Sequence, residues 1–249
     1  MPAQNHVEEC KRIQQEYVRR AREIPPDFYS LAKPANLFLH QQRNRAILAS
    51  LRRAGVCPVG ERRILEVGCG TGDWLVDFES WGAKREYLAG IDLDEARVMA
   101  ARRRMCEQRD ETGRILAPGA DIRLGDASHL PWPDASFDIV LQSTVFTSIL
   151  DDGMKQAVAA EMTRVLKLGG IVIWYDFFYN NPSNPNVKGV GASEIRGLFP
   201  GFSITLRRIT LAPPIARRLV GVSWVAALLL EKLRVLNTHH LGILRKPLA

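Results

Sequence analysis

Hydrophobic and polar positions in the middle of the chain form two kinds of segment that alternate. Short apolar runs predict strands at 63–68, 87–92, 121–125, 137–142 and 170–177. Amphipathic segments between them predict helices at 72–81, 94–109 and 153–167. Strands that alternate with helices are typical of a mostly parallel sheet with helices on both faces.

The two ends of the chain add further elements. Charged and amphipathic patterns predict helices at 7–22 and 35–54, and Pro25-Pro26 separates them. Alternation at 203–211 and 240–245 predicts two closing strands, and a short helix begins near Ser193. We therefore expect a single α/β domain: a doubly wound, mostly parallel, seven-stranded Rossmann-like sheet. Its parts are an N-terminal helical cap (1–58), a cofactor-binding core (59–178) and a C-terminal part (179–249) with a helical insertion at 212–238.

The first predicted strand runs directly into three glycines at alternate positions. Gly68, Gly70 and Gly72 allow a tight turn whose backbone can approach a bound ligand closely. The second strand ends in Asp92, 20 residues after Gly72, where a carboxylate can bind the hydroxyls of a ribose. This combination predicts a cofactor that contains a nucleoside.

The details of the glycine motif disfavour a dinucleotide. Dinucleotide folds use G-x-G-x-x-G, whereas this motif is G-x-G-x-G with Asp at position 73. Glu66 stands two residues before the first glycine, where a carboxylate repels a pyrophosphate and suits a cationic amino-acid group.

At these residues the chain resembles the class I S-adenosylmethionine-dependent methyltransferases, of the kind called type 11. The resemblance continues through Gly125-Asp126-Ala127, residues 130–140 and residues 165–170, and it covers roughly 60–178 in register. Four ordered motifs are far more specific than a glycine motif alone.

The resemblance implies S-adenosyl-L-methionine as cofactor and assigns its contacts. Asp92 binds the ribose, Leu93 lies against the adenine, Asp126 accepts from the adenine amino group, and Ala127 gives a backbone contact. The residues expected around the methionine end are Glu66, Gly68, Cys69, Gly70, Gly72 and Asp73, and those bordering the sulfonium are Gln142, Ser143 and Thr144.

The methyl acceptor is less well defined by the sequence. A hydroxyl acceptor requires a base, and Asp176, Tyr179 and His40 are the candidate catalytic residues. A carbon acceptor would depend more on aromatic side chains. The candidate substrate-binding residues are Tyr29, Phe146, Phe178 and Trp224.

Cysteine and histidine spacing predicts no metal site and a metal-independent reaction. The four cysteines, at 10, 57, 69 and 106, form no CxxC motif or disulfide framework, which favours a reducing, cytoplasmic location. The polar N-terminus does not begin like a signal peptide.

Positive charge is concentrated in the C-terminal part. From Ser203 onward there are eight Lys or Arg and one acid, which accounts for the whole formal charge of +7. The apolar run 219–230 inside this part is shorter than the ~20 residues that cross a bilayer. It suits a core helix, a lid, a homodimer contact or an interfacial helix at the inner membrane face. Nucleic acid is not expected, because the basic residues are not interleaved with aromatics.

The sequence therefore predicts an enzyme that methylates the oxygen or carbon of a small-molecule, hydrophobic or lipid-linked acceptor in a biosynthetic pathway. Two alternatives remain open: a relative that binds the cofactor without turnover, and a methyltransferase for a glycan or other polar metabolite. A nicotinamide-dependent enzyme is disfavoured by Glu66 and the missing third glycine. A macromolecular methyltransferase is disfavoured, since Gln142-Ser143-Thr144-Val145 stands where an Asn-Pro-Pro-Tyr or Asp-Pro-Pro-Tyr tetrapeptide would be expected.

Overall fold

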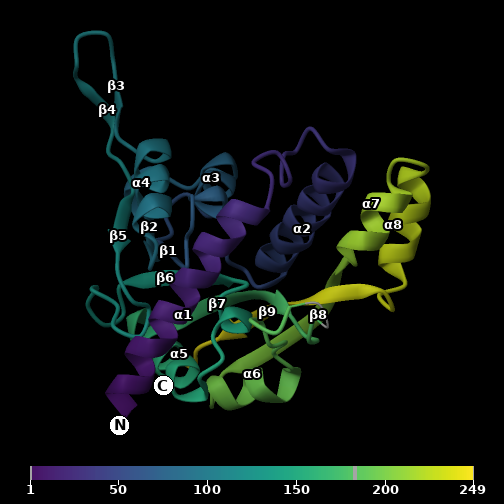
Figure 1. The fold of residues 1–249 in the computed structure, drawn as a ribbon. Coiled ribbons are helices and arrows are strands. Elements are labelled where there is room, and N and C mark those ends of the chain that lie inside the picture. The colour runs from purple at the N-terminus through teal and green to yellow at the C-terminus, as the bar shows by residue number, and fades with distance from the viewer. Residues whose placement is uncertain (1, 182–183, 249) are drawn as a thin grey trace.

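The computed structural model describes residues 2–181 and 184–248 and contains a seven-stranded sheet of order β5-β2-β1-β6-β7-β9-β8 (Figure 1). The first five strands in this order are parallel, and β9 is antiparallel to both β7 and β8. The strands are β1 Ile64–Val67, β2 Leu88–Asp92, β5 Asp121–Leu124, β6 Phe137–Ser143, β7 Leu166–Phe177, β8 Ser203–Leu211 and β9 Asn237–Arg245. The predicted fold class is confirmed.

Helices cover both faces of this sheet, as the alternating pattern predicted. Buried side chains of α2, α3 and α4 pack against one face, and those of α5 and α6 pack against the other. Neighbouring residues of β7 separate accordingly, with Trp174 in one core and Tyr175 in the other. The helices are α1 Pro2–Glu23, α2 Pro34–Arg53, α3 Asp73–Ser80, α4 Glu95–Arg104, α5 Asp152–Val165, α6 Ala192–Leu198, α7 Pro213–Leu219 and α8 Trp224–Lys232, with short 3₁₀ turns η1 Arg85–Tyr87 and η2 Phe146–Ser148.

Two predicted helices end earlier than expected. The helix predicted at 94–109 stops at Arg104, and the chain continues into a small projecting hairpin that the pattern did not predict: β3 Gln108–Arg109 and β4 Ile115–Ala117. The base of this hairpin is fixed by Ala120 N, which donates to Met105 O at 3.0 Å. The helix predicted at 153–167 stops at Val165, because Leu166 is extended and already pairs with Phe137 of β6.

The insertion between β8 and β9 forms α7 and α8, and its ends are joined by a 2.9 Å hydrogen bond from Ala212 N to Leu236 O. Buried residues of both helices form a third hydrophobic cluster with α2. Phe38 is fully buried at its centre and meets Trp224 edge to face, with 5.2 Å between ring centroids. None of the helices in the described ranges is long and apolar enough to cross a membrane.

We predict that truncation of Phe38, at the centre of the third cluster, strongly lowers the stability of the fold. Phe38→Ala should lower the free energy of unfolding by ~3–5 kcal/mol, because it removes a fully buried ring and leaves a cavity beside Trp224. Urea unfolding followed by circular dichroism measures this change. Leu168→Ala, at a position that is 59% exposed, is the control and should stay within ~0.5 kcal/mol of wild type. A small loss for Phe38→Ala would show that α7 and α8 add little to the stability of the sheet.

Candidate functional site

The glycine loop between β1 and α3 lies at the carboxyl edge of the sheet. Gly68, Gly70 and Gly72 all have positive φ, at +69°, +52° and +80°. A Cβ at Gly68 would collide with the side chain of Val145, and one at Gly70 would collide with the guanidinium of Arg97. Backbone conformation therefore favours glycine at all three positions, and close packing against Val145 adds to this at Gly68.

Asp92, at the end of β2, fastens this loop. One carboxylate oxygen accepts a 2.8 Å hydrogen bond from Gly70 N, and the other accepts from Asp94 N at 3.0 Å. Arg97 Nη1 lies 3.9 Å from the same carboxylate. Asp92 thus has a structural role that the sequence did not predict, in addition to its predicted position at the cofactor edge.

Glu66 is buried beneath the loop and only partly satisfied. Its Oε2 atom has no hydrogen-bond partner. Burial, together with the charges of Asp73 and Asp92, raises the pKa of Glu66 well above its ordinary value of 4.5. A cationic group placed here would find an unsatisfied acceptor. Burial also raises the pKa of the Cys69 thiol, which therefore remains protonated.

The loop after β5 carries Asp126 and joins the same edge. Gly125 N donates to Asp92 O at 3.0 Å, which holds the two strand ends together. Burial opposes ionisation of Asp126, but hydrogen bonds from His6 and from Ser128 N hold its pKa below the ordinary value. Ala127 and Leu93 lie half-buried in the hydrophobic cluster beside it.

The third part of this edge is the turn after β6. Gln142 is fully buried; its Oε1 atom accepts from Val145 N at 3.2 Å and its Nε2 atom has no partner. Thr144 has φ +57°, a conformation that is uncommon for a β-branched residue. With Ser143 before it, this turn lies next to Gly68, because Val145 is the residue that a Cβ there would strike. The structure thus brings the predicted cofactor residues of three loops to one edge.

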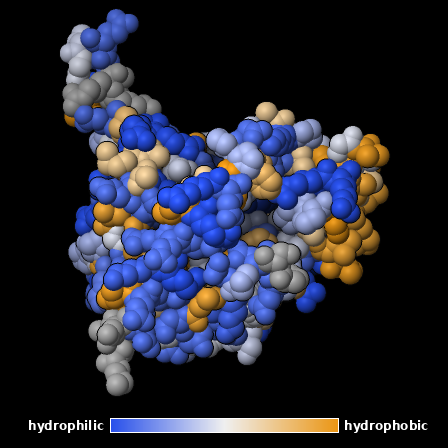
Figure 2. Space-filling model, viewed as in Figure 1, coloured by the Kyte–Doolittle hydropathy of each residue, from blue (hydrophilic) through white to orange (hydrophobic). Residues whose placement is uncertain are grey.

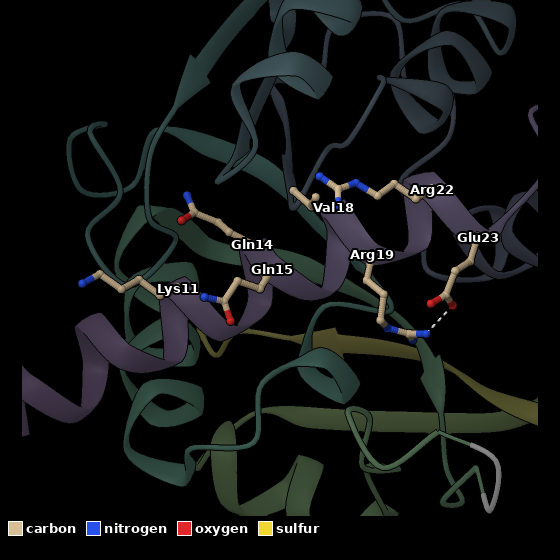
Figure 3. A pocket seen from close by; sticks show the side chains of 7 residues that line it. All are labelled: Lys11, Gln14, Gln15, Val18, Arg19, Arg22 and Glu23. Carbon is tan, nitrogen blue, oxygen red and sulfur yellow. Dashed lines mark hydrogen bonds and ion pairs between the residues drawn. The ribbon is translucent and has the colours of Figure 1, made fainter.

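Helix α1 lies across this edge and bonds to each neighbouring loop. Gln14 donates to Leu93 O at 3.1 Å, Arg12 donates to Ser148 O at 2.5 Å, and Glu9 accepts from Leu150 N at 2.5 Å. An open hollow on α1 is lined by residues of the helix itself, all but Val18 polar or charged (Figure 3): Lys11, Gln14, Gln15, Val18, Arg19, Arg22 and Glu23. None of the predicted cofactor residues lines this hollow.

Asp176 of β7 is the candidate base whose pKa is shifted to near neutrality. It is fully buried and accepts from Thr147 Oγ1 at 2.6 Å, from Thr147 N at 3.2 Å and from Phe177 N at 2.9 Å. Burial raises its pKa from 3.8 to about 7, in spite of these hydrogen bonds. A pKa near neutrality suits a general base, although both oxygens are already engaged.

The other two candidate bases lie in different surroundings. His40 of α2 contacts Asp77 at 3.1 Å, and Arg43 bonds to the same carboxylate at 2.7 Å, so His40 belongs to a charged cluster between α2 and α3. Tyr179 follows β7, is exposed, and packs edge to face on Phe177. The catalytic roles of all three candidates remain predictions.

The four candidate substrate contacts are dispersed. Phe146 is fully buried against Trp174, and Trp224 lies in the cluster of α2, α7 and α8. Tyr29 is 59% exposed in the loop between α1 and α2. Phe178 lies under Arg208 and stacks on His240. The structure does not bring these four side chains together.

Sequence analysis missed three residues at the glycine-loop edge. Arg97 packs on the ring of Tyr17 at 4.6 Å and contacts the glycine loop. His6 and Cys10 contact Asp126 from α1. The available signal was weak, because the predicted helix began at residue 7, whereas α1 begins at Pro2 and so places His6 and Cys10 one turn apart on one face.

Comparison with known proteins shows what the residues at this edge are similar to. Residues 65–174 match the family described as a methyltransferase domain. A probable S-adenosylmethionine-dependent methyltransferase of Mycolicibacterium smegmatis is 35% identical over 153 residues, which is 57% of this chain and 52% of the relative. The demethylmenaquinone methyltransferase of Lactiplantibacillus plantarum is 24% identical over 167 residues, 67% of this chain and 64% of the relative. The chain thus spans between about half and two thirds of these relatives.

Solved structures agree at the level of the fold. The crystal structure of the [4+2]-cyclase SpnF aligns with a TM-score of 0.59 at 21% identity and covers 84% of this chain and 83% of that one. At this identity the likeness concerns the fold alone.

The surroundings of Asp176 predict a specific pH dependence of stability. Between pH ~4 and ~7 the folded protein retains a proton on Asp176 that the unfolded chain has released, so rising pH lowers the free energy of unfolding. The slope from one such group is at most ~1.4 kcal/mol per pH unit. Asp176→Asn cannot titrate and should lose this component, so the variant gains on wild type as pH rises. Urea unfolding at several pH values measures the difference, and a difference that is constant with pH would contradict the assignment.

Proposed function

We propose that the protein, whose residues 65–174 match a methyltransferase domain, transfers a methyl group from S-adenosyl-L-methionine to a small hydrophobic or lipid-linked acceptor. The observation that carries the proposal is the glycine loop fastened to Asp92 above a buried, unsatisfied Glu66. In this proposal Asp92 serves the nucleoside and Glu66 serves the cationic group, both beside the same loop.

The residues at this edge fit the cofactor. The ammonium group of the methionine moiety supplies the donors that Glu66 Oε2 lacks, and the glycine loop leaves space for the backbone to approach it. In this proposal Asp92 binds the ribose and Asp126 accepts from the adenine amino group. When bound, the cofactor supplies a methyl group already activated by positive sulfur. The chain then has to align the acceptor and exclude water.

The acceptor class is inferred from the C-terminal insertion and from the relatives. The relative of Lactiplantibacillus plantarum is named for demethylmenaquinone. Hydrophobic residues gather over α7 and α8, at the right of Figure 2. The most exposed of them are Val222, Val225, Leu229, Leu233 and Val235, between 58% and 85% exposed. The proposed target atom is an oxygen or a carbon of the acceptor. For an oxygen acceptor, the candidate bases are Asp176, Tyr179 and His40.

The proposal has a direct binding test. Isothermal calorimetry should show S-adenosylmethionine binding that weakens at least about tenfold in Asp92→Ala, because charge-assisted hydrogen bonds of ~1.5–3 kcal/mol are lost. Asp92→Asn keeps an acceptor for Gly70 N and separates the loss of charge from loosening of the loop. NADH should not bind. Tight binding of NADH would contradict the proposal that S-adenosylmethionine is the cofactor.

Turnover is tested with cofactor labelled in its methyl group. Incubation with a lipid extract and with polar metabolites should place the label in the lipid fraction. Cofactor binding without any labelled product would favour the non-catalytic alternative, and label in a polar product would favour the glycan or polar-metabolite alternative.

We predict that cofactor binding releases a proton from Glu66. Its raised pKa leaves it more protonated than an ordinary glutamate, and the ammonium group of the cofactor stabilises the carboxylate. The binding enthalpy near neutral pH should therefore vary with the ionisation enthalpy of the buffer. Glu66→Gln should abolish this variation and weaken binding, whereas the surface variant Glu61→Gln should change neither. Equal enthalpies in all buffers for wild type would contradict the role of Glu66.

The insertion also provides a surface suited to an anionic membrane. Trp224 and Leu228 face the α2 cluster, whereas Val225 and Leu229 face outward. The same segment carries four exposed basic residues, of which Arg217 lies over the ring of Phe28: Arg217, Arg218, Lys232 and Arg234. We propose that this face of 212–238 associates peripherally with anionic lipid, which would bring the cofactor edge to a membrane-dissolved acceptor. A homodimer contact through the same face is the competing arrangement.

Vesicle co-sedimentation separates these arrangements. Wild type should bind anionic vesicles and lose binding at high salt, since each basic residue near the surface adds ~1 kcal/mol. Val225→Ser with Leu229→Ser should reduce binding at least about tenfold without unfolding, because each fully buried side chain contributes ~1.5–3 kcal/mol. Leu168→Ser, equally exposed but on β7, is the matched control. A wild type that ignores vesicles but forms a dimer disrupted by the double variant would favour the homodimer.

A further inference from the structure

Three side chains of different chemistry meet beneath the N-terminal half of α1. His6 Nε2 and Cys10 Sγ both contact the same oxygen, Oδ2 of Asp126, and the thiol lies 3.5 Å from it. One ligand atom from each residue lies within 4.8 Å of the other two. His6 and Cys10 share one face of α1, since they are one turn apart, and Asp126 reaches them from the loop after β5.

The donor set matches a borderline-soft divalent ion. An imidazole nitrogen, a thiolate sulfur and a carboxylate oxygen are the three ligand types that Zn²⁺ takes in proteins, at ~2.0–2.3 Å. Mg²⁺ and Ca²⁺ prefer sites made of oxygen alone, which this set is not. Three protein ligands leave a fourth tetrahedral position for water or for a neighbouring side chain.

The surroundings of the cluster hold its carboxylate in place. Ser128 N donates to the other oxygen of Asp126 at 2.8 Å, which leaves Oδ2 directed at α1. Ser128 Oγ lies 3.1 Å from His6 Nε2 and 2.9 Å from His129 Nδ1, so a second imidazole stands beside the cluster. Outer contacts of this kind orient metal ligands. All three ligand residues are half-buried, which shields the cluster while leaving access from solvent.

We propose that His6, Cys10 and Asp126 bind a zinc-like divalent ion that fastens α1 across the carboxyl edge of the sheet. As the ion binds, the Cys10 thiol releases its proton to solvent and the sulfur becomes a ligand. The ion replaces two hydrogen bonds on one oxygen by three metal–ligand bonds, and it links the first helix to the loop after β5.

The site is coupled to the cofactor through Asp126. This step rests on the proposed function, which assigns Asp126 to the adenine amino group. When Asp126 is bound to the ion, its carboxylate is less able to accept a hydrogen bond from the adenine amino group. The ion therefore lowers the affinity for the cofactor, and the cofactor lowers the affinity for the ion. By linkage the two effects are equal in free energy.

The metal site is tested on the full chain without any cofactor. Protein stripped with a chelator and kept in a non-thiol reductant is titrated with Co²⁺, and a near-ultraviolet thiolate-to-cobalt charge-transfer band is followed. Wild type should bind one equivalent with this band, and Zn²⁺ should displace it. Cys10→Ser should abolish the band, and His6→Ala should weaken binding at least about tenfold. Cys106→Ser, which removes an exposed thiol, should behave as wild type.

A band that survives in Cys10→Ser, or no stoichiometric binding in folded wild type, would overturn the metal site. Circular dichroism of each variant confirms that folding is retained.

The coupling is tested by calorimetry with S-adenosylhomocysteine, which is not consumed. Its affinity for wild type should fall at least about tenfold when Zn²⁺ is saturating, and in Cys10→Ser it should not change. An affinity that Zn²⁺ leaves unchanged in wild type would overturn the coupling. Absence of S-adenosylhomocysteine binding with and without Zn²⁺ would count against the proposed function and leave the metal site standing on the cobalt result.

Discussion

The hydrogen bonds between the glycine loop and the end of β2 determine the shape of the whole carboxyl edge. Cys69 N donates to Ile91 O at 2.9 Å and Gly70 N donates to Asp92 at 2.8 Å, so the loop is fixed on its neighbour by one backbone and one side-chain acceptor. The positive φ angles of the glycines are the condition for this arrangement. The position of α3, the burial of Glu66 and the contact with Val145 all follow from where the loop lies.

Helix α1 is held to this edge in a different way from the other long helices. Between residues 5 and 23 only Glu9 and Ile13 are buried, whereas α5 alone buries six side chains. The attachment of α1 therefore depends on polar contacts with loops, through Arg12, Gln14 and His6. Polar contacts exchange readily with water, so we expect α1 to open at a lower free-energy cost than α5. Access to the carboxyl edge is thus compatible with a rigid sheet.

The sequence was sufficient for the architecture because the strands of a parallel sheet are continuous apolar runs. β1 and β2 are buried at every position. No predicted end of these two strands differs from the observed end by more than one residue. The hairpin of β3 and β4 was missed because its strands are only two and three residues long, too short for an alternating pattern to show. The predicted cofactor residues meet at one edge because they follow the ends of parallel strands in order along the chain.

Acceptor residues could not be placed, because no motif relates a residue such as Trp224 to a distant partner such as Phe38. The helical insertion was expected, but which of its side chains face inward depends on α2, nearly two hundred residues away. The same reason hid the second role of Asp92 and the contacts of His6 and Cys10 with Asp126: each joins segments whose proximity only the fold creates.

The insertion of α7 and α8 grows from the tip of the hairpin formed by β8 and β9, and the bond between Ala212 N and Leu236 O closes its base. Such a position would ordinarily allow the segment to be lengthened, shortened or exchanged without disturbing the sheet. Here that freedom is limited, since the same segment covers Phe38 of the N-terminal cap. A chain that acquires a different insertion must also acquire a different α2, so in evolution and in engineering these two distant segments have to change as a pair.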